Sequence, residues 1–160
     1  MDSLLQASRK LGFLLDQNDV AGALRYLNGL TSVRFTALYR FDQEQLRNRF
    51  FFDRMNPDTA STEDTPLEAS YCIYVRQNRG PFLVADSLRD ERVRGHAKQP
   101  TVRSYCGVPL IDAQGWMYGS VCHFDFEPHP LQESDVLLLE EVAHLLSRDA
   151  QGMPDLRVRA

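Results

Sequence analysis

Two apolar segments on either side of a short polar turn constrain this chain most. Residues 102–111 and 117–126 are rich in Val, Ile, Tyr and Phe, and the polar run 112–115 separates them. Gly115 closes that run, and glycine adopts a positive φ at little cost, as a hairpin turn requires. The pattern predicts an antiparallel hairpin.

A second hairpin is predicted nearer the N-terminus. Between Phe35 and Phe41 side chains alternate between two partly apolar faces, which indicates a strand covered on both sides. The polar run 42–44 follows, and the segment 46–54, centred on three phenylalanines, returns. A further short strand is predicted at 82–85, directly before Asp86.

Helical spacing of apolar residues predicts helices within the first thirty residues and at 132–148. A middle helix is predicted to begin at Thr65. Thr65 and Glu68 have the spacing of a capping box, and Pro66 suits the first helical position. Hairpin-joined strands give an antiparallel sheet that the helices must cover, so we expect an α+β fold.

Composition excludes several classes of protein. The chain has 160 residues, of which 43% are hydrophobic and 25% charged, as in a globular domain. A net charge of −4 disfavours nucleic-acid binding. Asp2 stands where a signal peptide carries bases, and no apolar stretch is long enough for a membrane span, so we expect a cytoplasmic protein without membrane contact. Three cysteines argue against a disulfide framework.

Basic residues concentrate between Arg76 and Arg103. This segment holds seven bases and three acids. Such a run is compatible with a solvated face, or with a positive rim around a site for an anionic ligand.

The second half of the chain resembles the GAF domain family. The resemblance rests on FLVAD at 82–86, RSYCGVPL at 103–110 and GSVCHFD at 119–125, preceded by SYC at 70–72. It covers roughly 20–148. It implies a six-stranded antiparallel sheet with terminal helices on one face and a pocket under the middle helix on the other. Members of the family act as sensors in signal transduction, bind small molecules and often form homodimers through their terminal helices.

The resemblance also implies domain bounds. We expect a bacterial GAF domain at 1–150, with a helix at 1–17 as a candidate dimer contact and a flexible tail at 151–160. On this basis the candidate ligand-binding residues lie on the middle helix, at strand ends and in the last hairpin: Phe52, Tyr71, Cys72, Tyr74, Asp86, Arg103, Tyr105, Cys106, Cys122 and Phe124. Large aromatic residues also fill cores, so each of them has a purely structural interpretation too.

Asp86 and Arg103 each have two interpretations. Asp86 is suited to cap the turn that begins at Ser87, or to contact a ligand. Arg103 is suited to pair with a nearby carboxylate, or to bind a phosphate or carboxylate of a ligand. The cap and the ion pair are the simpler expectations.

Cys106 and Cys122 are expected to lie nearly opposite each other on paired strands. Buried free cysteines usually act as small hydrophobic residues. If the protein is an enzyme, this pair is the candidate for a thiol-dependent reductase similar to the free methionine-R-sulfoxide reductases of the GAF family. His123 cannot easily activate Cys122, because successive strand residues point to opposite faces.

Metal and cofactor signals are weak. There is no Cys-x-x-Cys motif and no closely spaced His pair, so no metal ligands are predicted. Cys72 is followed by Ile73 rather than the His of bilin-binding GAF domains, and we expect no cofactor. The sequence thus favours a sensory module for an unidentified small molecule. A thiol-dependent reductase and a ligand-free dimerisation module are the alternatives.

Overall fold

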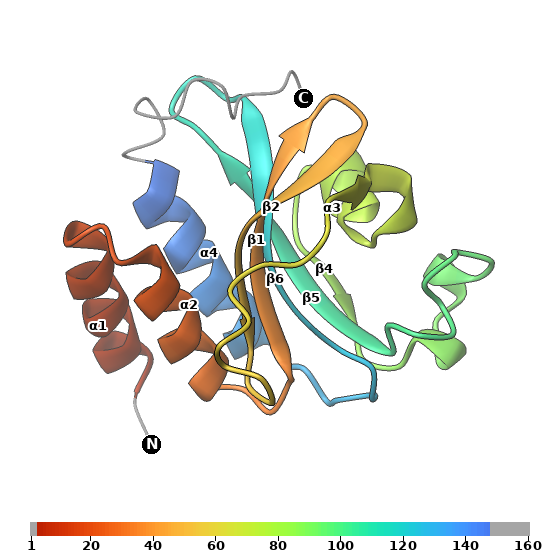
Figure 1. Cartoon of the computed structure of the whole chain (residues 1–160), viewed down its shortest axis with the longest axis horizontal. Coiled ribbons are helices and arrows are strands. Elements are labelled where there is room, and N and C mark those ends of the chain that lie inside the picture. The colour runs from red at the N-terminus through yellow and green to blue at the C-terminus, as the bar shows by residue number, and fades with distance from the viewer. Residues whose placement is uncertain (1–2, 148–160) are drawn as a thin grey trace.

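The fold is a six-stranded antiparallel sheet with helices on both faces (Figure 1). The computed structural model describes residues 3–147. The strands run in the order β3-β2-β1-β6-β5-β4. Their bounds are β1 Phe35–Asp42, β2 Gln45–Asp53, β3 Thr65–Pro66, β4 Phe82–Val84, β5 Ser104–Ile111 and β6 Met117–Asp125. The α+β architecture predicted from the hairpins is confirmed.

Three helices cover one face of the sheet, which we call the helical face (Figure 1). They are α1 Leu4–Asp16, α2 Val20–Gly29 and α4 Glu133–Ser147. Two of these helices begin at residues whose side chains cap the first turn. Ser3 and Gln6 form a capping box at α1, and the Asp19 side chain accepts a hydrogen bond from the Gly22 amide at α2. Within residues 3–147, no helix is long and apolar enough to cross a membrane.

The opposite face, which we call the α3 face, carries a short helix and the segment that follows β4. Helix α3 is Cys72–Asn78, and the single turns η1 Leu67–Ala69, η2 Ser87–Arg89 and η3 Glu91–Val93 are 3₁₀. The sheet separates two hydrophobic cores. In β1, Ala37 and Tyr39 belong to the core under α3, whereas Leu38 belongs to the core under the terminal helices. This is the alternation predicted for that strand.

The predicted start of the middle helix at Thr65 is wrong. Thr65 and Pro66 form the edge strand β3, paired with Leu46 and Gln45, and α3 begins only at Cys72. The local capping pattern is outcompeted, because pairing with β2 satisfies the backbone groups of this segment in an extended conformation.

The hairpin of β5 and β6 forms as predicted, with Gly115 at φ 84° in its turn. The N-terminal helix expected at 1–17 spans Leu4–Asp16. The tail predicted at 151–160 lies outside the described residues.

Candidate functional site

A cavity of about 270 Å³ lies on the α3 face, between the sheet and the segment 69–71 that leads into α3. Aromatic and apolar side chains form its wall: Tyr39, Leu46, Tyr71, Val102, Tyr105 and Phe124. Cys122 adds a thiol from the centre of the sheet. A concave apolar wall with few polar groups is the usual architecture of a small-molecule site.

The mouth of this cavity is polar and charged. Thr62, Glu63, Asp64 and Lys98 line it and are exposed. Asp64 is already engaged, because its carboxylate accepts hydrogen bonds from the Arg47 guanidinium at 3.2 Å and from the Asn48 amide at 2.9 Å. Lys98 is therefore placed to meet an anionic group and Glu63 a cationic one.

Tyr71 connects the cavity wall to the strand that follows. Its hydroxyl donates a hydrogen bond to the carbonyl oxygen of Val102 at 3.1 Å, just before β5 begins. Its ring meets that of Tyr105 edge-on, with centroids 5.6 Å apart. Burial raises the pKa of Tyr71 to about 12, so the hydroxyl keeps its proton at neutral pH.

Two buried thiols meet beneath the wall. The Sγ of Cys72 lies 3.1 Å from the Tyr105 hydroxyl and 3.1 Å from Ser120 Oγ, and Cys122 belongs to the same core under α3. Burial by itself opposes ionisation of Cys72. The hydrogen bonds from Cys122, Ser120 and Tyr105 outweigh it and lower the pKa of Cys72 to about 6. The same contact with Cys72, together with burial, raises the pKa of Cys122.

Four of the candidate residues line the cavity: Tyr71, Tyr105, Cys122 and Phe124. Cys72 lies behind them in contact with Tyr105. Tyr74 packs elsewhere on α3, stacked on Phe82 with ring centroids 4.8 Å apart.

The expected place of Cys106 at this site is wrong. Its strand neighbour is His123, and Cys122 pairs with Gly107, so the predicted register is right to within one residue. One residue is enough to reverse the face: Cys106 belongs to the core under the terminal helices, and Cys122 to the core under α3. These two thiols cannot act together. Burial raises the pKa of Cys106 to about 12.

The expected place of Phe52 is also wrong. It pairs with Thr36 on the helical face, where it lines a separate cavity of about 510 Å³ between α2 and β2. The Arg25 guanidinium lies 5.5 Å from its ring centroid. Phe51, its neighbour, packs in the core under α3 instead. Three consecutive phenylalanines carry no alternation from which the inward-facing one could be read.

Asp86 and Arg103 pair with each other, away from the cavity. The guanidinium of Arg103 donates to Asp86 at 2.8 Å, and Asp86 also accepts from the Leu88 amide and caps η2. Hydrogen bonding from Arg103 holds the pKa of Asp86 below its usual value. Both residues thus have the cap and ion-pair roles that were the simpler expectations.

The basic segment is largely neutralised by its own neighbourhood. Arg92 pairs with Asp90 at 2.6 Å and Arg76 with Glu44 at 3.1 Å. Among the seven bases between 76 and 103, Lys98 is the one that lines this cavity. A continuous positive rim is therefore not formed here.

Sequence reasoning missed several residues of the site. Tyr39 and Val102 line the cavity, and Ser120 donates to Cys72. The alternation of β1 placed Tyr39 on the same face as Ala37, which was a usable signal. Ser120 and Cys72 are 48 positions apart, and no local pattern indicates such a contact.

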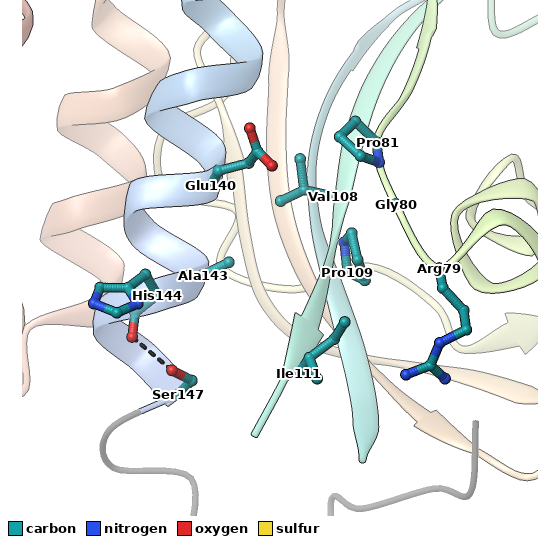
Figure 2. Close-up of a pocket in the computed structure, with 10 residues that line it drawn as sticks. All are labelled: Arg79, Gly80, Pro81, Val108, Pro109, Ile111, Glu140, Ala143, His144 and Ser147. Atoms are coloured by element: carbon teal, nitrogen blue, oxygen red, sulfur yellow. Dashed lines mark hydrogen bonds between the residues drawn. The ribbon is translucent and has the colours of Figure 1, made fainter. Parts of the chain in front are cut away.

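A third cavity, of about 280 Å³, lies between the C-terminal half of α4 and the β5 edge (Figure 2). Glu140 and Arg79 stand at opposite sides of it, and Val108, Pro109 and Ile111 lie between them (Figure 2). Its polar groups therefore do not converge. Among residues 3–147, no group of three or more His, Cys, Asp or Glu side chains could hold a metal ion.

A family model described as the GAF domain matches residues 20–149 of this chain. The chain belongs to the GAF domain family. The cavity of this GAF domain lies on the face opposite the terminal helices, as the resemblance implied, beside the segment 69–71 that leads into the middle helix.

A curated relative is a cyclic di-GMP phosphodiesterase of Pseudomonas aeruginosa. It is 42% identical over 86 residues, which are 51% of this chain and 15% of that protein. The GAF domain described here thus spans a small part of the length of the relative it matches.

Solved structures share the fold. The free methionine-R-sulfoxide reductase of Neisseria meningitidis, in complex with its substrate, has a TM-score of 0.74 at 16% identity, over 94% of this chain and 90% of that one. The GAF domain of the Acinetobacter phosphoenolpyruvate-protein phosphotransferase has a TM-score of 0.71 at 15% identity, over 97% and 99%. At these identities the likeness establishes the fold of this GAF domain and nothing finer.

Proposed function

We propose that this GAF domain is a sensory module of signal transduction that binds a small molecule in the cavity on the α3 face. The observation that supports this most is the cavity itself, with its aromatic wall, its charged mouth and its position on the α3 face. Family membership and the similarity to a cyclic di-GMP phosphodiesterase support a place in signalling.

The volume limits the ligand. About 270 Å³ is at the small end of protein ligand sites, which favours a compact metabolite over a tetrapyrrole. An apolar or aromatic body would contact Tyr71, Tyr105 and Phe124. A polar end would reach the mouth, where Lys98 favours an anionic group.

A route from the cavity to the helical face runs through β5. The Tyr71 hydroxyl donates to the carbonyl of Val102, two residues before this strand. Tyr105 faces the cavity, and the next residue, Cys106, packs in the core shared with α4. A ligand that displaces Tyr71 or Tyr105 would thereby shift β5 against α4. Such coupling requires that the ligand bind one of the two arrangements more tightly.

The output surface that we propose is the exposed side of the terminal helices. Leu5 and Phe13 on α1 are 60% and 57% exposed, and Leu137 on α4 is 47% exposed. Apolar side chains on helices that already pack together favour contact with a second copy of the chain. The same side chains favour a second candidate function, ligand-free dimerisation.

The test is a thermal-shift screen of small metabolites, preceded by native mass spectrometry of the purified protein for a retained ligand. A ligand at one hundred times its Kd stabilises the fold by about 2.7 kcal/mol, which raises Tm by roughly 5–10 °C for a chain of this size. Val102→Trp, which fills the cavity, should abolish the shift. The matched control Met55→Trp, at a side chain that is 68% exposed and lies outside both the cavity and the terminal helices, should retain it.

Equal shifts in Val102→Trp and the wild type would place the ligand elsewhere and contradict the proposal. Sedimentation velocity on the same samples separates the two functions. A dimer that forms at micromolar concentration, with no stabilising metabolite and no retained mass, would favour ligand-free dimerisation.

A further inference from the structure

Two thiols from distant parts of the chain converge at the floor of the cavity. Cys72 is the first residue of α3, and Cys122 lies in the middle of β6. Both are at most 1% exposed to solvent. The third cysteine, Cys106, lies on the other side of the sheet and has no part in this arrangement.

Cys72 is surrounded by hydrogen-bond donors. The Tyr105 hydroxyl and Ser120 Oγ each lie 3.1 Å from its sulfur, and Cys122 stands two residues beyond Ser120 in the same core under α3. A sulfur that accepts such bonds is suited to carry negative charge. These surroundings lower the pKa of Cys72 and raise that of Cys122, so Cys72 is the sulfur of the pair that carries the negative charge when one proton is lost.

A glycine makes this arrangement possible. The Tyr105 hydroxyl lies against Gly107 on the same strand, and a Cβ at position 107 would overlap the hydroxyl and its ring. Because Gly107 leaves that space empty, the Tyr105 ring can lie along the strand and reach Cys72.

The pair is accessible to a small reactant from one side only. Cys122 lines the cavity, whose mouth is formed by exposed residues, whereas Cys72 lies behind it. A molecule in the cavity therefore meets the Cys122 sulfur first.

We propose that Cys72 and Cys122 form an oxidisable dithiol, which a small hydroperoxide entering the cavity converts to an intramolecular disulfide. The Cys122 sulfur attacks the terminal peroxide oxygen while its proton passes to Cys72. The O–O bond breaks, and the departing oxygen anion takes a proton from water, which leaves a sulfenic acid on Cys122.

The Cys72 sulfur then attacks the sulfenic sulfur and expels water, and the S–S bond forms. In sum, one thiol, one thiolate and one hydroperoxide give one disulfide, one alcohol (water in the case of hydrogen peroxide) and one hydroxide ion. The thiols lose two electrons and the O–O bond gains them. The disulfide would tie the start of α3 to the centre of the sheet and remove the proton acceptor of Tyr105.

This inference goes beyond the proposed ligand binding and does not depend on it, because it needs only entry of a small oxidant. The test treats the purified reduced wild-type protein with stoichiometric hydrogen peroxide. Remaining thiols are then alkylated after unfolding, and peptides are mapped by mass spectrometry. We expect the loss of two hydrogen atoms, a disulfide between Cys72 and Cys122, and an alkylated Cys106.

Three free thiols, or a disulfide that includes Cys106 or a second chain, would overturn the proposal. Since this experiment uses the wild-type chain, its outcome does not depend on whether a variant folds. Cys106→Ser is the matched control and should form the disulfide at the wild-type rate. Cys72→Ser should stop at a Cys122 sulfenic acid, which gains one oxygen atom and can be trapped with dimedone.

Tyr105→Phe tests the role of the donor to Cys72. Tyr105 is a positioning residue here, and its removal should move the pH profile of disulfide formation upward. A movement of about one pH unit slows the reaction about fivefold at pH 6 and leaves it nearly unchanged at pH 9. A merely structural effect would slow the reaction equally at both pH values, which would contradict this role.

Discussion

Acid should destabilise this protein well before its carboxylates titrate, because of one buried histidine. His123 lies in β6 on the helical face and is fully buried. Its Nδ1 lies 2.7 Å from Thr36 Oγ1, which also accepts a hydrogen bond from Asn28 Nδ2 at 2.9 Å. Burial, reinforced by the charge of Arg54, lowers the pKa of His123 from 6.5 to about 3.

Proton linkage gives the direction and the size of the effect of His123 on the free energy of unfolding. The unfolded chain binds a proton at this site below pH 6.5, whereas the folded chain stays neutral until about pH 3. The neutral imidazole therefore contributes stability that is present above pH 6.5 and is lost as pH falls toward 3. Between pH 6.5 and 4.5 the loss is about 2 kcal/mol, since each pH unit is worth about 1.4 kcal/mol once the unfolded histidine is charged.

The assay is urea unfolding at a series of pH values between 7 and 4.5 for the wild type and His123→Gln. The variant removes the titrating group and keeps a polar side chain. We expect the free energy of unfolding of the wild type to fall by about 2 kcal/mol more than that of the variant over this range. The control His144→Gln, on the exposed side of α4, should follow the wild type.

If wild type and His123→Gln lose stability in parallel, the buried neutral imidazole is not the cause and the reasoning is refuted. A carboxylate origin is distinguishable by its range. Asp53, with a pKa of about 2, contributes only below about pH 4.

Three further predictions concern the scaffold. Gly119→Ala should prevent folding, because a Cβ there would overlap a backbone carbonyl oxygen of β1. In the control Gly29→Ala, the added Cβ meets nothing within 4 Å, so the Tm should change by a few degrees at most. Circular dichroism melts compare the two variants. Leu24→Ala, in the core under the terminal helices, should cost about 2–5 kcal/mol in urea unfolding. Asp53→Asn breaks the bidentate pair with Arg34 and should cost about 1.5–3 kcal/mol at pH 7. In urea unfolding, the difference from the wild type should shrink below about pH 4 and vanish as pH falls through the Asp53 pKa of about 2. Equal stabilities at pH 7 would show that the pair contributes nothing.

The sheet and the terminal helices could be predicted from sequence because each is encoded locally. Alternation placed Tyr39 and Leu38 on opposite faces, and the helical spacing of apolar residues indicated the terminal helices. The failure at Thr65 shows the limit of local signals. Its capping pattern is real, but pairing with β2 decides the conformation.

The candidate site was predicted only in outline. Tyr105, Cys122 and Phe124 reach the cavity because alternation along β5 and β6 points them to the α3 face. Phe52 failed because a run of three phenylalanines has no alternation, and a bulge opposite Leu38 and Tyr39 shifts the register of β2. The convergence of Cys72 with Cys122 is a tertiary contact between residues 50 positions apart, and no spacing in the sequence encodes it.

Gly119 helps to determine which side chains of β6 point to each face of the sheet. Its Cα approaches the Tyr39 carbonyl so closely that a residue with a side chain cannot take its place. A slip of β6 by one position would bring Tyr118 or Ser120 to that point, so the close approach acts as a lock on strand alignment. Without it, a misaligned hairpin would exchange Cys122 for His123, and the cavity would lose its thiol and gain an imidazole. The absence of a Cβ at Gly119 therefore keeps the Cys122 thiol on the α3 face and the His123 imidazole on the helical face.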